Sequence, residues 1–227
     1  FQAEDGIRDA QESRGLGDVY KRQDKLMRQL AEMQRYRADM STTGFRMVNP
    51  AGRTMQVYRG CNYRDNVGIL RRLAHDNFIG TASGVVVRAE VFRQVGMFDE
   101  SFSPCEDYEL WTRIISAGFR FRFVCTPLVV YHYHGGERIS ISSASVRGYR
   151  RFVHRFRSLI DRYGLRRFHV QEMLYRTAKL HLFAHDRRGF LRNLRRAVRV
   201  YPWVPTHTLL YLFAPLAGFF RSRGWVK

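Results

Sequence analysis

The stretch SGVVVRAEVFRQVG, residues 83–96, changes its hydrophobic period in the middle of the run. Its first half is rich in valine, which is typical of a strand, and its second half has the spacing of a short helix that ends at Gly96. A strand that passes directly into a helix is a common unit of α/β folds. The stretch therefore predicts a short strand that is followed directly by a short helix.

The segments on both sides extend this pattern. Asp24 is placed to cap a helix that runs to about residue 38, and its apolar residues at helical spacing are Leu26, Leu30 and Met33. Residues 43–48 and 53–58 flank the turn signal Asn-Pro-Ala-Gly and predict a hairpin. The other elements expected before residue 146 are a helix over 67–73, a helix near 106–117, and two strands over 119–124 and 127–134.

From residue 146 onward the chain is strongly basic. This segment holds 19 Lys or Arg and three acids, and it therefore carries most of the net charge of +19. Its hydrophobic stripes predict three helices, over 149–163, 170–185 and 190–200, the first of them ended by Gly164. We expect a domain over residues 24–145 and a basic helical tail over residues 146–227.

The tail ends in an apolar segment from Tyr201 to Phe220, which approaches the roughly 20 residues of a membrane span. Three prolines and a polar Thr-His-Thr interrupt it. We therefore expect this segment to lie on or dip into an anionic membrane surface at the inner face of the cell membrane, with a soluble core helix as the alternative. The three cysteines have no metal-ligand or disulfide spacing, which favours a reducing, cytoplasmic location.

Residues 1–23 alternate charges and glycines without a helical or strand period. They resemble translated sequencing-adapter read-through. We therefore expect an artefactual or disordered leader that packs against nothing.

The stretch SPCEDYELWTRIISAG, residues 103–118, contains two adjacent carboxylates. With Ser103 as N-cap, Glu106 falls at the third helical position and completes a capping box. Asp107 instead lies on the apolar face of the helix, which Leu110, Ile114 and Ala117 define. Composition alone favours a well-capped helix, and the position of Asp107 favours a cleft.

The stretch VVYHYHGGERIS, residues 129–140, brings together groups that bind anions and metals. Strand alternation puts His132 and His134 on one face, and the glycine pair that follows lets backbone N–H groups turn inward as an anion-binding nest. With Arg138 these groups suit a metal ion and a diphosphate. An exposed histidine, an ordinary turn and a solvated arginine explain the same residues separately.

Taken in order and spacing, residues 77–102, 106–118 and 127–140 resemble the second half of the family 2 glycosyltransferases, which have a GT-A fold. The resemblance extends back to DKLMRQLAEMQ and covers roughly residues 24–141. It implies an α/β, Rossmann-like sheet, transfer of a sugar from a nucleotide-sugar donor to a sugar or lipid-linked acceptor, and a divalent metal, Mg²⁺ or Mn²⁺. It suits an inverting enzyme of cell-envelope polysaccharide or glycolipid synthesis.

The resemblance also assigns roles to individual residues. Asp107 is implied to be the base that deprotonates the acceptor hydroxyl, with Glu106 and Trp111 on the acceptor side. His134 is implied to help hold the metal and the diphosphate. The other implied substrate-binding residues are Ser83, Gly84, Gly135, Gly136 and Arg138.

The sequence departs from the family in one respect. The nucleotide-binding βαβ half and its Asp-x-Asp motif are missing, and no Asp-x-Asp occurs in these 227 residues. We therefore expect an incomplete sheet, an incomplete metal site and a chain that is inactive alone. Two alternatives remain, a basic non-catalytic module that binds membranes or nucleic acid, and a catalytically dead lectin or scaffold with the same fold. Because the arginines flank apolar stripes, nucleic acid is the less favoured partner.

Overall fold

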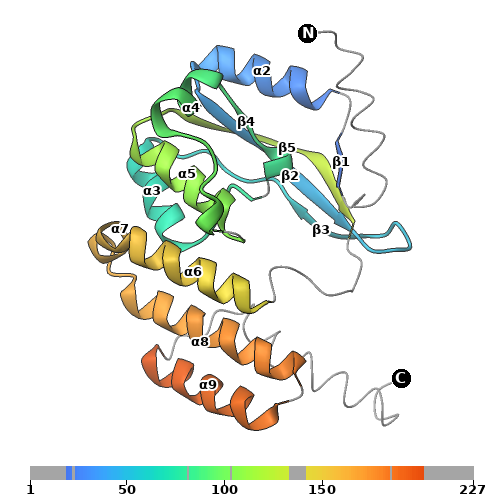
Figure 1. Cartoon of the computed structure of the whole chain (residues 1–227). Helices are drawn as coiled ribbons and strands as arrows, with labels where there is room; N and C mark the ends of the chain where they lie inside the picture. Colours follow the sequence, from blue (N-terminus) through green and yellow to red (C-terminus); the bar gives the residue numbers. More distant parts are fainter. Residues whose placement is uncertain are drawn as a thin grey trace.

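The computed structural model describes residues 19–21, 24–80, 82–102, 104–132, 142–184 and 186–201. They form a mixed α/β structure, as the sequence predicted, with a sheet flanked by helices and a stack of helices below it (Figure 1). The strands are β1 (Val19–Lys21), β2 (Met40–Val48), β3 (Thr54–Tyr58), β4 (Val86–Val87) and β5 (Phe121–His132). The α-helices are α2 (Lys25–Tyr36), α3 (Asn66–His75), α4 (Ala89–Val95), α5 (Glu106–Ser116), α6 (Ser143–Arg155), α7 (Arg157–Arg162), α8 (Arg166–Phe183) and α9 (Arg187–Val200), and the 3-10 turns are η1 (Ala82–Gly84) and η2 (Glu100–Phe102).

The described sheet has the order β1-β5-β2-β3, with β4 on the other end of β2. The strands β2 and β5 run parallel, and all other pairs are antiparallel. The predicted hairpin is confirmed as β2 and β3, and the strand-to-helix switch as β4 and α4.

The two strands expected over 119–124 and 127–134 form one continuous strand, β5, so the predicted break is wrong. Pro127, which suggested the break, lies opposite Gly44 at a point where the register with β2 shifts. A proline is tolerated at such an irregularity because its missing N–H is not required there. The hydroxyl of Thr43 bridges the same point by donating to the carbonyl of Thr126 at 2.6 Å.

The expectation that residues 1–23 pack against nothing is wrong for three of them. Val19–Lys21 form β1, which pairs antiparallel with β5, Val19 opposite Tyr131. The pairing uses backbone hydrogen bonds, which do not need the side-chain alternation that the sequence analysis looked for. The rest of that leader lies outside the described residues.

Helix α2 was predicted in the right place, but with the wrong face toward the protein. Lys25, Gln29 and Met33 are its buried residues, whereas Leu26 and Leu30 are 54% and 40% exposed. This face is buried because the side-chain amide of Gln29 donates hydrogen bonds to the hydroxyl of Ser41 on β2 at 3.1 Å and to the carbonyl of Gly84 at 3.0 Å.

One hydrophobic core runs through the boundary that was expected at residue 146. Tyr149 and Phe152 of α6 belong to the same buried cluster as Leu73 of α3, Leu110 of α5 and Phe123 of β5. Helices α6, α8 and α9 then stack side by side away from α5 (Figure 1). Helix α6 is therefore part of the same core as the preceding elements, and α8 and α9 pack outward from it.

The helices expected after residue 146 are confirmed, with one difference. The predicted 149–163 stripe is divided at Phe156, whose backbone leaves the helical region, into α6 and α7. Gly164 ends the second part with a positive φ of 68°. The apolar segment predicted to lie on a membrane falls almost wholly within residues 202–227, outside the described part of the chain.

Candidate active site

The two carboxylates of interest lie at the start of α5. The helix begins at Glu106 with Cys105 in the N-cap position, and the Cys105 side chain makes no cap hydrogen bond. Glu106 is thus the first helical residue, so the predicted capping box is wrong; Ser103 lies outside the described residues. The first turn carries Glu106, Asp107 and Glu109, all acids, which the positive end of the helix dipole favours.

Asp107 is half-buried, as expected for a carboxylate on the apolar face of α5. Its Oδ1 accepts a hydrogen bond of 2.6 Å from the backbone N–H of Tyr108, and it also accepts one from the side chain of Asn77. Burial, and to a lesser extent the neighbouring Glu106, raise the pKa of Asp107, while the two hydrogen bonds lower it; the net result is a pKa of about 6. A carboxylate of this kind is ionised at neutral pH and is basic enough to take a proton.

Tyr108 fixes the helix turn that carries Asp107. Its hydroxyl donates to the carbonyl oxygen of Leu73 near the end of α3, and its ring stacks on Phe152 with the centroids 3.7 Å apart. The last carbonyls of a helix lack partners within the helix, so this bond satisfies one of them. Helices α3, α5 and α6 are thereby locked together beside Asp107.

Glu109 has a structural role in the same turn. It is fully buried, and its carboxylate pairs with Arg113 at 2.9 Å and with Arg155 of α6 at 3.1 Å. Arg113 also donates to the carbonyls of Gly96 and Met97 after α4. These contacts use both oxygens of Glu109 and connect α5 to its neighbours, so Glu109 is not available for proton transfer.

The remaining predicted residues are placed as follows. Trp111 is 2% exposed and packs edge-on against Phe98, and its indole Nε1 is buried without a hydrogen-bond partner among the described residues. Gly84 is buried, with its carbonyl bonded to Gln29, and Ser83 is half-buried beside it. The predicted metal and diphosphate residues His134, Gly135, Gly136 and Arg138 lie outside the described residues.

Sequence reasoning missed Asn77, which contacts Asp107 from the connection after α3. A single asparagine in a loop carries no pattern, so only its neighbourhood in the fold identifies it. His169 was missed for a similar reason: it lies in the middle of the basic segment, yet it is fully buried.

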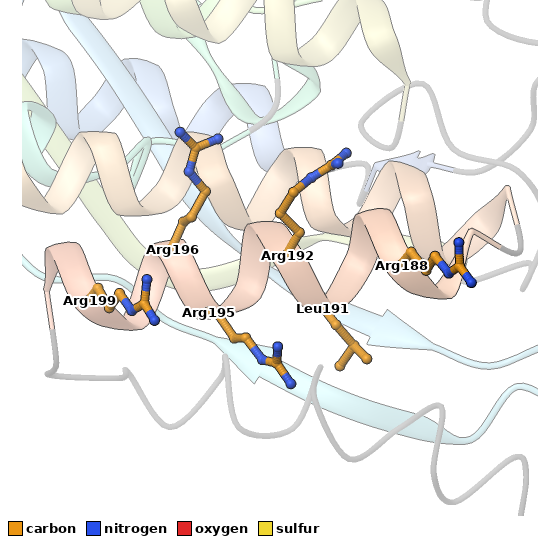
Figure 2. Close-up of a pocket in the computed structure, with 6 residues that line it drawn as sticks. All are labelled: Arg188, Leu191, Arg192, Arg195, Arg196 and Arg199. Carbon is orange, nitrogen blue, oxygen red and sulfur yellow. The ribbon is translucent and has the colours of Figure 1, made fainter.

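Among the surface hollows formed by described residues are two that do not include Asp107. One, of about 490 Å³, is lined by residues of α9 alone (Figure 2). The other, of about 510 Å³, lies between η2 and α6 and is lined by Ser101, Phe102, Arg150, Arg151, His154 and Arg155. Both hollows are basic, and we assign the catalytic chemistry to neither.

No helix within the described ranges is long and apolar enough to cross a membrane. The same ranges contain no group of three or more His, Cys, Asp or Glu side chains that could hold a metal ion.

The family model described as glycosyl transferase family group 2 matches residues 22–220, which is most of the chain. The comparison with curated proteins gives no match.

Proposed function

This chain belongs to glycosyl transferase family group 2, and from that membership we propose that Asp107 is the base of an inverting sugar transfer. The acceptor hydroxyl attacks the anomeric carbon of a nucleotide sugar, its proton passes to the Asp107 carboxylate, and the bond from the anomeric carbon to the diphosphate breaks on the opposite face. The observation that carries this proposal is the half-buried carboxylate at the start of α5, with a pKa of about 6.

Glu106 is proposed to bind the acceptor beside the base. Its Oε2 is buried and has no hydrogen-bond partner among the described residues. A buried acceptor atom without a donor is costly, and a hydroxyl of a bound sugar would supply that donor. Ser83, which is half-buried, and the buried Gly84 and Trp111 remain predicted substrate contacts.

The donor side is proposed from the sequence alone. The described residues do not form a metal site, so we derive no step through a metal ion. His134, Gly135, Gly136 and Arg138 stay the predicted ligands of the metal and diphosphate. Since the sequence has no Asp-x-Asp motif, we propose that the chain alone transfers sugar very slowly or not at all.

Sugar transfer is tested with this chain joined to a nucleotide-binding half that carries an Asp-x-Asp motif, here called the donor-competent enzyme. It is incubated with a panel of nucleotide sugars and polyol or lipid-linked acceptors, and the anomeric configuration of the product is read by NMR. Inversion of configuration supports the proposed mechanism. Retention would rule out a single displacement with Asp107 as base.

We further propose that the protein works at the inner face of the cell membrane, on an acceptor of envelope polysaccharide or glycolipid synthesis. The support is the outer face of α9 (Figure 2). Gly189, Asn193 and Ala197 are the buried residues of α9, and the close approach of α8 at Gly189 leaves no room for a Cβ, because it would lie 2.3 Å from the His181 ring. The exposed arginines of α9 are Arg187, Arg188, Arg192, Arg195, Arg196 and Arg199.

No α9 arginine makes an ion pair with a described residue, which leaves this face free for an anionic surface. Each Arg near an anionic bilayer contributes about 1 kcal/mol to binding. Vesicles with and without phosphatidylserine, and duplex DNA at matched salt, separate the partners. We expect binding to anionic vesicles that weakens when Arg192, Arg195 and Arg196 become Gln, but not when the exposed Arg53, Arg71 and Arg93 do. Equal or tighter binding to DNA would favour the nucleic-acid alternative.

A further inference from the structure

Asn77 contacts the proposed base from another part of the chain. Its side chain donates a hydrogen bond to Asp107, and its own Oδ1 is buried without a partner among the described residues. An ionised carboxylate can only accept hydrogen bonds, so the amide nitrogen of Asn77 must face it. The amide oxygen is thereby turned away from Asp107 and remains available.

The backbone around Asn77 is held on both sides. The N–H of Asp76 bonds to the carbonyl of Arg72 at 2.9 Å, and the N–H of Phe78 bonds to the carbonyl of Asp76 at 3.0 Å. Phe78 is buried and packs edge-on against Tyr63, with the ring centroids 5.3 Å apart. The connection after α3 is therefore fixed relative to α5, to which α3 is already tied by Tyr108.

We propose that Asn77 is the positioning residue of Asp107: its amide NH₂ holds the carboxylate toward the acceptor, and its Oδ1 accepts from a second hydroxyl of the same acceptor. This inference rests on the proposed role of Asp107. A group that donates to an ionised carboxylate stabilises its charged form and restricts its rotation. Both effects serve a base that must be ionised and aimed before the acceptor arrives.

The free acceptor atoms also define the kind of acceptor. Asn77 Oδ1 and Glu106 Oε2 are both buried without a donor among the residues that the structure describes; Glu106 precedes Asp107 in the chain, and Asn77 contacts it. A ligand that satisfies them must donate hydrogen bonds. A neutral polyhydroxyl group, such as a sugar ring, donates such bonds. A phosphate or carboxylate would be repelled by the carboxylates of Glu106 and Asp107. The site therefore fits the uncharged sugar portion of an acceptor.

Several other titratable groups lie near Asp107 and Asn77. Glu106 acts directly on Asp107, and the Cys105 thiol beside it has a pKa raised to about 11 by burial, so it stays neutral. Asp76 beyond α3 and Arg176 of α8 act on the adjacent Tyr108. Asn77 itself does not titrate. Replacing Asn77 therefore changes the pKa of Asp107 without removing a charge from the site.

The test is an NMR titration of the Asp107 carboxyl carbon in the full chain, with the signal assigned through Asp107→Asn. We expect Asn77→Ala to move the midpoint upward by roughly one pH unit, the effect of losing a hydrogen bond to a charged group. The matched control is Asn66→Ala, which also removes an asparagine side chain that donates a hydrogen bond, in this case 3.0 Å to the Phe119 carbonyl. It should leave the midpoint unchanged.

Asn77→Asp keeps the side-chain volume and serves if Asn77→Ala does not fold; it should raise the midpoint further by charge repulsion. An unchanged midpoint in a folded Asn77 variant would overturn the inference.

In the donor-competent enzyme, the acid limb of kcat against pH should move upward in Asn77→Ala. If that limb stays in place while Asp107→Asn abolishes turnover, the positioning role fails and the proposed function stands; an active Asp107→Asn variant fails the proposed function itself.

Discussion

The hydroxyl of Tyr149 and Nδ1 of His169 lie 2.6 Å apart in the interior, and Nε2 of the same histidine lies 2.6 Å from the carbonyl oxygen of Ala74. A backbone carbonyl only accepts, so Nε2 carries the proton and Nδ1 accepts from Tyr149. One neutral histidine thus joins α6 and α8 to the end of α3. Ala74 lies three residues before Asn77, so α6 and α8 support the connection that carries Asn77.

His169 should make the stability of the protein sensitive to acid. Burial lowers its pKa from 6.5 to about 4, so between these values the unfolded chain binds a proton that the folded chain does not. Stability contributed by neutral His169 is therefore present above pH 6.5 and is lost as the pH falls toward 4. We expect His169→Phe to cost about 2 to 3 kcal/mol in free energy of unfolding at pH 7 and much less at pH 4.5. Urea unfolding at both pH values measures this, and an equal cost at both would contradict the assignment.

Tyr108→Phe should loosen α5 without changing its sequence pattern. The variant keeps the ring that stacks on Phe152 but leaves the buried Leu73 carbonyl without its donor. We expect a loss of about 1 to 3 kcal/mol in the free energy of unfolding. The control is Thr112→Val on the same helix, where the hydroxyl only adds a second bond, of 2.8 Å, to the Tyr108 carbonyl. Thr112→Val should lower the free energy of unfolding by clearly less than Tyr108→Phe does. Equal losses would mean that the hydrogen bond from Tyr108 to α3 does not stabilise the protein more than the Thr112 bond.

Glu109→Gln should be strongly destabilising, because it leaves the arginines that Glu109 pairs with short of a buried negative charge. Breaking such a pair from one side costs about 3 to 5 kcal/mol. Glu90→Gln is the matched change on α4: its pair with Arg93 is exposed, at 3.6 Å, and its removal should cost less than about 1 kcal/mol. Thermal unfolding of both variants gives the comparison, and a small effect at Glu109 would show that its buried charge is not needed.

The sequence was sufficient wherever hydrophobic period decided the structure, and insufficient where single polar contacts did. The hairpin, the strand-to-helix switch and the three later helices follow from apolar spacing. The buried face of α2 does not, because Gln29 is drawn to Ser41 by a hydrogen bond that no period encodes. The same applies to β1, which pairs with β5 through its backbone.

The candidate site shows the same division. The helical face of Asp107 could be read from its spacing to Leu110 and Ile114, and the family resemblance supplied its role. The helix start could not, since Cys105 rather than Ser103 precedes the first turn. The roles proposed for Asn77 and Glu106 could not be identified from sequence spacing. The two residues stand out because each has a buried oxygen without a hydrogen-bond donor among the described residues, and because Asn77 bonds to Asp107.

Asp107 should also cost the protein stability at neutral pH. Its pKa is raised from 3.8 to about 6, so the folded chain keeps a proton that the unfolded chain releases between these values, and stability falls as the pH rises through 6. Asp107→Asn removes this penalty. We expect it to raise the free energy of unfolding by about 1 kcal/mol at pH 8 and by less at pH 4.5, after allowance for the part of the side chain that water reaches. A loss of stability at pH 8 would mean that the charge is favourably placed.

The most direct test of the account is turnover by the donor-competent enzyme with Asp107→Asn, measured beside Glu106→Gln and the unchanged protein, with nucleotide-sugar affinity measured in parallel. Asn preserves the shape of the side chain but cannot take a proton, so we predict that turnover falls by roughly 10² or more while donor binding stays near normal. Glu106→Gln should reduce turnover less, because an amide oxygen still accepts a hydrogen bond. Turnover of Asp107→Asn within a few-fold of the unchanged enzyme would contradict the central claim that Asp107 is the base.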